Sequence, residues 1–154
     1  MQVEVQVEPP FDAAVDADWL AGVAVAVLVA EGMPHSASLT VVVMDDAQLQ
    51  DLNRTYRQVD APTDVLAFAA QEGEPFVMPE AGGAYLGDVI VSYPTALAQA
   101  NEAGRSVASE LALLVVHGCL HLLSYDHGDD DERACMWARQ DEILRTLGYA
   151  GVAP

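Results

Sequence analysis

One stretch of eleven residues decides both the fold and the site that we expect of this chain: His117-Gly118-Cys119-Leu120-His121-Leu122-Leu123-Ser124-Tyr125-Asp126-His127. An uninterrupted apolar run from Leu111 to Val116 precedes it, and Ser106 is of a residue type that caps the N-terminus of helices. We therefore expect one helix from about Ser106 to about Leu123. This helix carries the first two histidines near its C-terminal end.

The spacing of the histidines predicts a metal site. Residues four positions apart lie one above the other on a helix, so His117 and His121 can direct two imidazoles at one ion. His127 follows six residues later, and the chain must leave the helix near Ser124 to bring it to the same ion. Three neutral nitrogen ligands leave a fourth zinc position for water, which distinguishes a catalytic site from a structural one. The fourth histidine, His35, is expected in a loop.

Strands and further helices are predicted on both sides of this helix. Valines alternate with polar residues over 2–8, which predicts a half-buried strand. Short apolar runs predict three more strands, at 38–44, 65–69 and 86–92. Caps, prolines and glycines mark the ends of four further helices, at 12–31, 45–56, 94–103 and 130–147. The glycines and prolines of 71–83 predict a loop, and the chain length predicts one domain over residues 1–154.

No segment has the features of a membrane span or a secretion signal. The longest apolar run, Trp19–Ala30, has twelve residues, against the roughly 20 needed to cross a bilayer. Residues 1–5 lack the basic start of a signal peptide, so we expect a cytoplasmic protein with no membrane partner. The two cysteines, Cys119 and Cys135, are too few for a disulfide framework and are expected to be packed as thiols. Cys119 should face away from the two helical histidines.

The charge of the chain is strongly negative. Six arginines and no lysines stand against 24 acidic residues, which gives a net charge of −18. Affinity for nucleic acid normally comes from basic side chains that neutralise phosphates, so any contact with RNA must be local. The simplest explanation of the acidity is solubility in a salty cell interior, and the second is a basic protein partner.

The residue after the first histidine argues against one class of zinc enzyme. In HExxH metallopeptidases this residue is a glutamate that acts as general base, whereas here it is Gly118. A peptidase of that kind is therefore disfavoured. Asp126, next to the third histidine, has two open interpretations: it holds a metal ligand in place from behind, or it is a turn residue before the last helix.

Three segments carry a resemblance to the YbeY family of bacterial rRNA maturation endoribonucleases. His117–His127 is similar to the family signature H-G-x-L-H-L-x-G-Y-D-H. Leu52–Phe68 reads LNRTYRQVDAPTDVLAF and is similar to L-N-x-x-Y-R-x-x-D-x-P-T-D-V-L-S-F. Leu86–Ser92 reads LGDVIVS and is similar to L-G-D-I-x-I-S, and residues 136–144 resemble the C-terminal helix of the family.

The resemblance implies an α+β fold, in which about five helices flank a mixed four-stranded sheet and the metal is placed as in zincins. It implies that His117, His121 and His127 bind one Zn²⁺ per chain, and that Arg57 and His117 are catalytic. A guanidinium such as that of Arg57 would stabilise negative charge on a phosphodiester. Arg54, one turn earlier, is expected at the surface.

The activity that the resemblance implies is zinc-dependent cleavage of single-stranded RNA in rRNA maturation, at the 3′ end of 16S rRNA, and in ribosome quality control. The implied partners are rRNA, ribosomal particles and a basic small-subunit ribosomal protein. Two departures from the family pattern stand at Ser124, where the family has glycine, and Ala67, where it has serine. If position 124 requires a positive φ, serine costs roughly 1 kcal/mol there.

Two other functions remain open at this point. A different metallohydrolase, such as a peptidase, would cleave peptides and leave RNA intact. A non-catalytic ribosome-assembly factor would use zinc to fold, and its function would survive the loss of Arg57.

Overall fold

The computed structural model describes residues 1–58, 63–70, 84–123, 125 and 128–149, without the side chains of Arg57 and Ala84. Its elements are β1 (Gln2–Val7), the 3-10 helix η1 (Phe11–Ala13), α1 (Ala17–Ala30), β2 (Ala37–Met44), α2 (Asp46–Arg57), β3 (Val65–Ala69), β4 (Ala84–Ser92), α3 (Tyr93–Ala103), α4 (Val107–Leu122) and α5 (Asp130–Thr146). The described part therefore confirms the predicted α+β class, with four strands and five α-helices.

The described strands form one mixed sheet in the order β1-β2-β4-β3. β1 runs parallel to β2, and β2 runs parallel to β4, so that Val5 lies opposite Val41 and Val41 opposite Val89. β3 pairs with β4 in the antiparallel direction, with Val65 opposite Val91. Valines on neighbouring strands therefore point to the same face of the sheet and form a continuous apolar surface.

One glycine of the Leu86–Ser92 segment is required by the pairing of β3 with β4. Gly87 has a φ of +137°, and a Cβ at this position would collide with the carbonyl oxygen of Phe68. Only glycine combines this backbone conformation with so close an approach. The Leu52–Phe68 and Leu86–Ser92 segments thus meet in the sheet.

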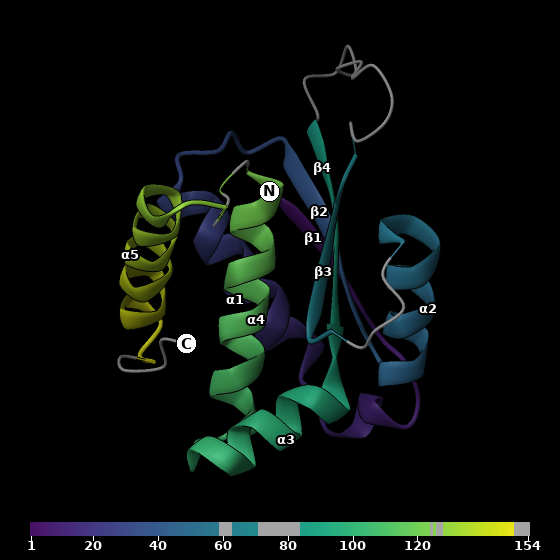
Figure 1. The fold of residues 1–154 in the computed structure, drawn as a ribbon. Coiled ribbons are helices and arrows are strands. Elements are labelled where there is room, and N and C mark those ends of the chain that lie inside the picture. The colour runs from purple at the N-terminus through teal and green to yellow at the C-terminus, as the bar shows by residue number, and fades with distance from the viewer. Residues whose placement is uncertain (59–62, 71–83, 124, 126–127, 150–154) are drawn as a thin grey trace.

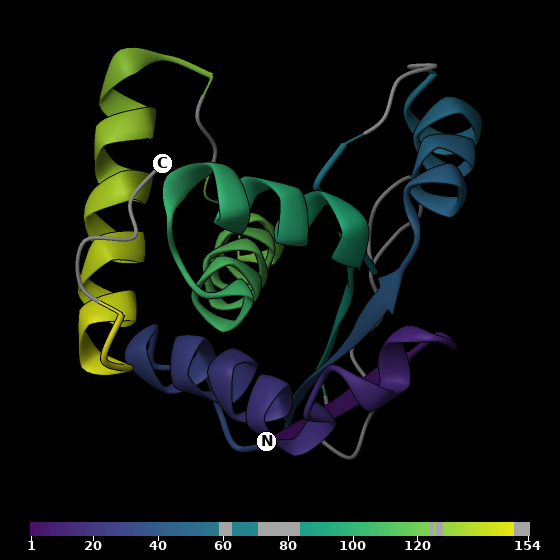
Figure 2. The same cartoon turned by 90° about the horizontal axis from the view of Figure 1, so that it is seen from below.

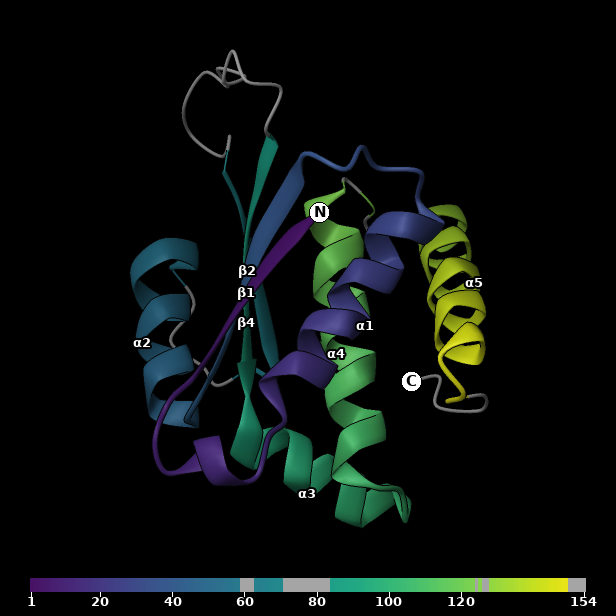
Figure 3. The ribbon, with the colours of Figure 1, turned by 180° about the vertical axis from the view of Figure 1, so that it is seen from behind.

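The sheet separates two helical layers (Figure 1). α2 covers one face, where its Leu49 packs with Leu66 and Ile90. α1 and α4 cover the other face, and α5 packs against α4 on the side away from the sheet (Figures 1 and 3). Val41, Val43, Val89 and Val91 therefore face α1 and α4, whereas Val42 lies on the α2 side.

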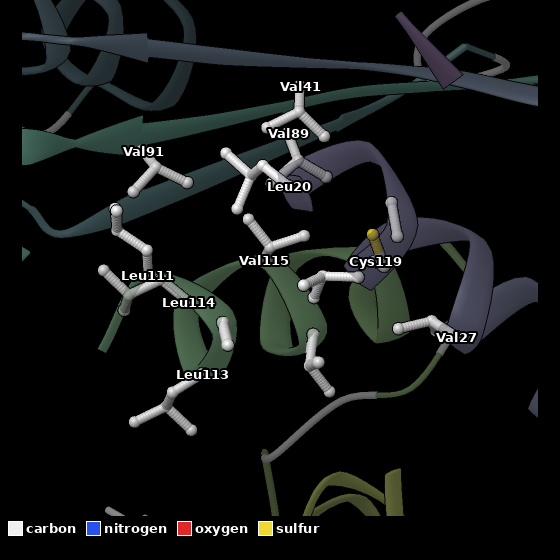
Figure 4. Close-up of a cluster of buried hydrophobic side chains, with 14 of the residues drawn as sticks. Leu20, Val27, Val41, Val89, Val91, Leu111, Leu113, Leu114, Val115 and Cys119 are labelled. Atoms are coloured by element: carbon white, nitrogen blue, oxygen red, sulfur yellow. The ribbon is translucent and has the colours of Figure 1, made fainter. Parts of the chain in front are cut away.

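α4 is the central helix of the protein. Figure 2 looks along it and shows α1, α3, α5 and the sheet around it. All residues from Ser109 to Val116 are buried, as expected of a helix that is apolar on all sides. Leu111 and Val115 meet Val89 and Val91 of β4 in the core between helix and sheet (Figure 4). The two histidines are thus carried by the most enclosed element.

Two expectations need correction. The helix expected over 12–31 begins only at Ala17, because the Asp16 carboxylate accepts hydrogen bonds from the backbone N–H groups of Asp18 and Trp19 and so caps the helix there. Cys135 is exposed on α5 and not packed, whereas Cys119 is buried as predicted.

Two further expectations concern the loop at 71–83 and the lack of a membrane span. The loop expected over 71–83 lies outside the described residues. Within them, no single helix is both long and apolar enough to cross a membrane, and α3 and α4 reach that length only as a pair bent by 120°.

Candidate metal and RNA site

His117 and His121 lie one turn apart on α4, as their spacing predicts. Their ring centroids are 4.7 Å apart and their ring planes meet at 79°. Both side chains are half-buried at the C-terminal end of the helix. Two imidazoles this close together can share one metal ion.

Gln140 of α5 holds one ring nitrogen of His117. The Nδ1 atom of His117 lies 2.9 Å from the Oε1 atom of Gln140, whose side chain is only 1% exposed. A carboxamide oxygen only accepts, so this contact places the imidazole proton on Nδ1. The lone pair of His117 is then on Nε2, and this atom can act as a metal ligand.

The absence of a side chain at Gly118 allows the histidine-bearing helix to pack closely against the sheet. A Cβ at this position would lie 2.6 Å from Cγ1 of Val89 and 3.2 Å from Cγ2 of Val65. No larger side chain fits without moving α4 away from β3 and β4. The glutamate that follows the first histidine in HExxH peptidases would therefore be forced against the sheet at this position.

A pocket of about 460 Å³ opens beside His117. α4 contributes His117, Leu114, Leu113 and Glu110, which recur at helical spacing on one face. The remaining lining comes from the start of β3, the end of α3, the α3–α4 junction and α5: Asp64, Val65, Gln99, Glu102, Ala103, Arg105, Trp137 and Gln140. The pocket therefore reaches His117, the first of the two histidines.

Several polar groups of this pocket are held by one another. Arg105 pairs with the buried carboxylate of Glu110 at 2.9 Å, and the Nε2 of Gln99 donates to the carboxylate of Asp64 at 3.3 Å. The indole of Trp137 meets the imidazole of His117 edge to face, with ring centroids 5.7 Å apart. Side chains from α3, α4, α5 and the residue before β3 are thus fixed around one opening.

α2, the helix that ends in Arg57, is fixed at its other end. Its cap Asp45 forms a capping box with Gln48. The carboxylate of Asp46 accepts hydrogen bonds from the hydroxyl groups of Ser92 and Thr95, the second at 2.6 Å, and so ties α2 to the start of α3. The side chain of Arg57 is not described, so its predicted place in the site is untested.

Arg54, by contrast, is 58% exposed and pairs with Asp51 at 2.8 Å, which confirms it as a surface residue. It is one of five arginines whose side chains the structure describes, and every one of them is paired with a carboxylate. The pairs are Arg54 with Asp51, Arg105 with Glu110, Arg133 with Asp130, Arg139 with Glu31 and Glu142, and Arg145 with Asp141. The described surface therefore offers a phosphate little uncompensated positive charge.

The predicted third ligand, His127, lies outside the described residues, together with Ser124 and Asp126. Among the described residues alone, no group of three His, Cys, Asp or Glu side chains could hold a metal. The donors that are described nevertheless suit zinc, since two neighbouring imidazoles lie together and Gln140 fixes the tautomer of one. Cys119 takes no part, because its side chain is buried in the core (Figure 4), and its spacing of two positions from each histidine places it on another side of the helix. Burial raises the pKa of its thiol to about 12.

The sequence did not point to Gln140, Trp137 or the pocket. Gln140 stands 23 positions after His117, and no local spacing joins two residues on different helices. The one available signal was the resemblance of residues 136–144 to a family helix, which contains both Gln140 and Trp137.

Comparisons with known proteins agree with the resemblance seen in the sequence. The family model described as Endoribonuclease YbeY matches residues 5–148. A Moorella thermoacetica protein named Endoribonuclease YbeY is 52% identical over 122 residues, which cover 77% of this chain and 78% of that protein. A Roseiflexus protein of the same name is 47% identical over 150 residues, which cover 96% of this chain and 94% of that protein.

A solved structure has a similar fold. The solution structure of TM1509 from Thermotoga maritima covers 97% of this chain with a TM-score of 0.55 at 20% identity, and 94% of that protein is matched. At this identity the likeness concerns the fold alone. The family match spans both histidines of α4, the Gly118 contact and the Gln140 contact, and on this basis the chain belongs to the Endoribonuclease YbeY family.

Proposed function

We propose that this chain is a zinc-dependent endoribonuclease that cleaves single-stranded segments of rRNA, including the 3′ end of 16S rRNA, and serves ribosome quality control. Membership of the Endoribonuclease YbeY family supports the endoribonuclease activity. The observation that carries the metal dependence is the pair of imidazoles on α4, with Gln140 on Nδ1 of His117.

The residues of the chain have separate tasks in this proposal. When bound by His117, His121 and His127, a zinc ion supplies Lewis-acid chemistry for phosphodiester hydrolysis. Gln140 keeps the proton of His117 on Nδ1. Arg57, which the family resemblance assigns to function, would hold the phosphate and stabilise the charge that develops on it.

The charges of the chain support a local contact with RNA. The described arginines are neutralised by carboxylates, so few groups besides Arg57 and the metal would attract a phosphate. A net charge of −18 suits a basic small-subunit ribosomal protein as the partner that brings the chain to ribosomal particles. We propose the cytoplasm as its compartment, where such particles are assembled.

A cleavage assay with four proteins tests the activity. Wild type, His117→Ala, Arg57→Ala and Arg54→Ala would each be loaded with zinc and offered single-stranded RNA, duplex RNA and an unstructured peptide. Arg54→Ala is the matched control, because Arg54 lies on the same helix but pairs with Asp51 at the surface. We expect wild type and Arg54→Ala to cut single-stranded RNA, and the other two to lose about 100-fold or more in kcat/KM.

Two results would contradict the proposal. Cleavage of the peptide but not of RNA, abolished in His117→Ala, would identify a peptidase. Tight binding to ribosomal particles without RNA turnover, unchanged in Arg57→Ala, would identify an assembly factor. Circular dichroism of each variant separates loss of activity from loss of folding.

A further inference from the structure

The pocket beside His117 has the length of a binding site for part of a nucleotide. It follows one face of α4 from His117 to Glu110, seven residues apart, which corresponds to about 10 Å along a helix axis. Its volume of about 460 Å³ is in the range of small-ligand sites. A phosphodiester bound at the histidines would therefore have this pocket as its nearest neighbouring space on the α5 side.

The charges of the lining decide which part of a nucleotide fits. Three carboxylates, those of Asp64, Glu102 and Glu110, stand against the single guanidinium of Arg105, which already pairs with Glu110. Such a lining repels phosphate and favours groups that donate hydrogen bonds. Trp137 adds aromatic surface, on which bases stack favourably. The pocket suits a base and not the sugar-phosphate backbone.

Asp64 is placed to read the edge of that base. Asp64 directly precedes Val65, whose side chain lies beside Gly118 of α4. Asp64 is therefore close to the turn of α4 that carries His117. Its carboxylate accepts a hydrogen bond from Gln99, which fixes its orientation while carboxylate oxygens can accept several bonds at once. A fixed acceptor favours an exocyclic amino group over a carbonyl.

We propose that this pocket receives the base next to the cleaved phosphodiester, and that Asp64 makes it prefer bases with an exocyclic amino group. This inference rests on the proposed endoribonuclease function and names the specificity of the same site. Cytosine and uracil provide the matched test, because they have the same size and differ at C4, where cytosine has an amino group and uracil a carbonyl, and at N3, which carries a proton only in uracil.

Binding can be measured without cleavage. The chain has two tryptophans, so a Trp19→Phe background leaves Trp137, which lines the pocket, as the only indole. In this background, without metal, we expect cytidine to quench the fluorescence saturably with a Kd about tenfold lower than that of uridine. Asp64→Asn should remove the difference, whereas Asp12→Asn, the same charge change on the exposed η1, should keep it.

Cleavage gives an independent readout. Single-stranded RNAs with one cytosine or one uracil beside a defined cleavage position would be compared by kcat/KM with zinc-loaded protein. We expect the cytosine RNA to be favoured about tenfold by wild type and by Asp12→Asn, and a ratio near one for Asp64→Asn.

The two measurements separate the failure of this inference from the failure of the proposed function. Selective quenching by cytidine without any RNA cleavage would leave the base pocket in place and overturn the nuclease proposal. Cleavage with no dependence on Asp64, together with equal or absent quenching by both nucleosides, would overturn the pocket. Quenching by N-acetyl-lysine amide in preference to cytidine would also overturn it, because the site would then take a basic side chain of a protein.

Discussion

Replacement of Gly118 by alanine tests how closely the histidine helix must pack on the sheet. The added Cβ would lie 2.6 Å from Cγ1 of Val89 and 3.3 Å from its Cγ2, and the first distance is shorter than van der Waals contact allows. Val89 is fully buried and its β-branched side chain has few rotamers, so it cannot turn aside easily. α4 must move or Val89 must be strained.

The expected magnitude follows from two opposing terms. Alanine in place of glycine inside a helix stabilises it by about 1 kcal/mol. Overpacking of a core costs about 1–3 kcal/mol. Gly22 of α1 provides the matched control, because its Cβ would meet nothing within 4 Å. We therefore expect Gly22→Ala to gain about 1 kcal/mol of unfolding free energy, and Gly118→Ala to fall about 1–3 kcal/mol below Gly22→Ala.

Urea unfolding of both single variants measures this difference. In the double variant Gly118→Ala/Val89→Ala the smaller side chain at 89 should make room for the new Cβ. The loss of unfolding free energy in the double variant should then be smaller, by about 0.5–3 kcal/mol, than the sum of the losses in the two single variants. Equal stabilisation by Gly118→Ala and Gly22→Ala would refute the reasoning. So would strict additivity of the changes at 118 and 89.

Four further predictions concern the thiols, the metal and salt. Cys135 should react with a thiol reagent in the native protein and Cys119 only after unfolding. Because burial raises the pKa of Cys119 to about 12, the unfolded state loses this proton first, and stability should fall between about pH 9 and 12 in wild type but less in Cys119→Ala. Gln140→Leu should weaken zinc affinity roughly 10–100-fold in chelator competition. A cooperative thermal unfolding transition of the metal-free variant, like that of wild type, would show that the variant still folds. With one or two phosphates neutralised, the slope of log K against log salt for single-stranded RNA should be only about −0.7 to −1.4.

Most of the fold could be predicted because its signals are local. Alternating valines predicted β1, and Pro94 and Gly104 predicted the ends of α3. The start of α1 was wrong because the sequence 11–18 offers several acidic caps, and only the hydrogen bonds of Asp16 select one. Cys135 was wrong because a position beside apolar residues on a helix does not decide which face meets solvent.

The site was predictable only where one helix carries it. The spacing of His117 and His121 fixes their relation, since four residues make about one turn. The contact of His117 with Gln140 depends on how α5 packs against α4, which no periodicity in either helix encodes. The importance of Gly118 changed in the same way: the sequence showed a missing glutamate, and the structure shows a contact with Val89 that requires glycine.

The acidity of the chain, together with the pairing of its described arginines, has a consequence for how the protein meets RNA. A protein of charge −18 whose described arginines are all paired gains no long-range attraction towards free RNA, so encounter with free RNA should be slow. The pocket beside His117 would supply selectivity after contact, through a base and not through phosphates. On the proposed function, a ribosomal particle with basic proteins at its surface would provide both the electrostatic attraction and the single-stranded RNA. The same charge that weakens a free nuclease would thus confine cleavage to RNA presented on such a particle.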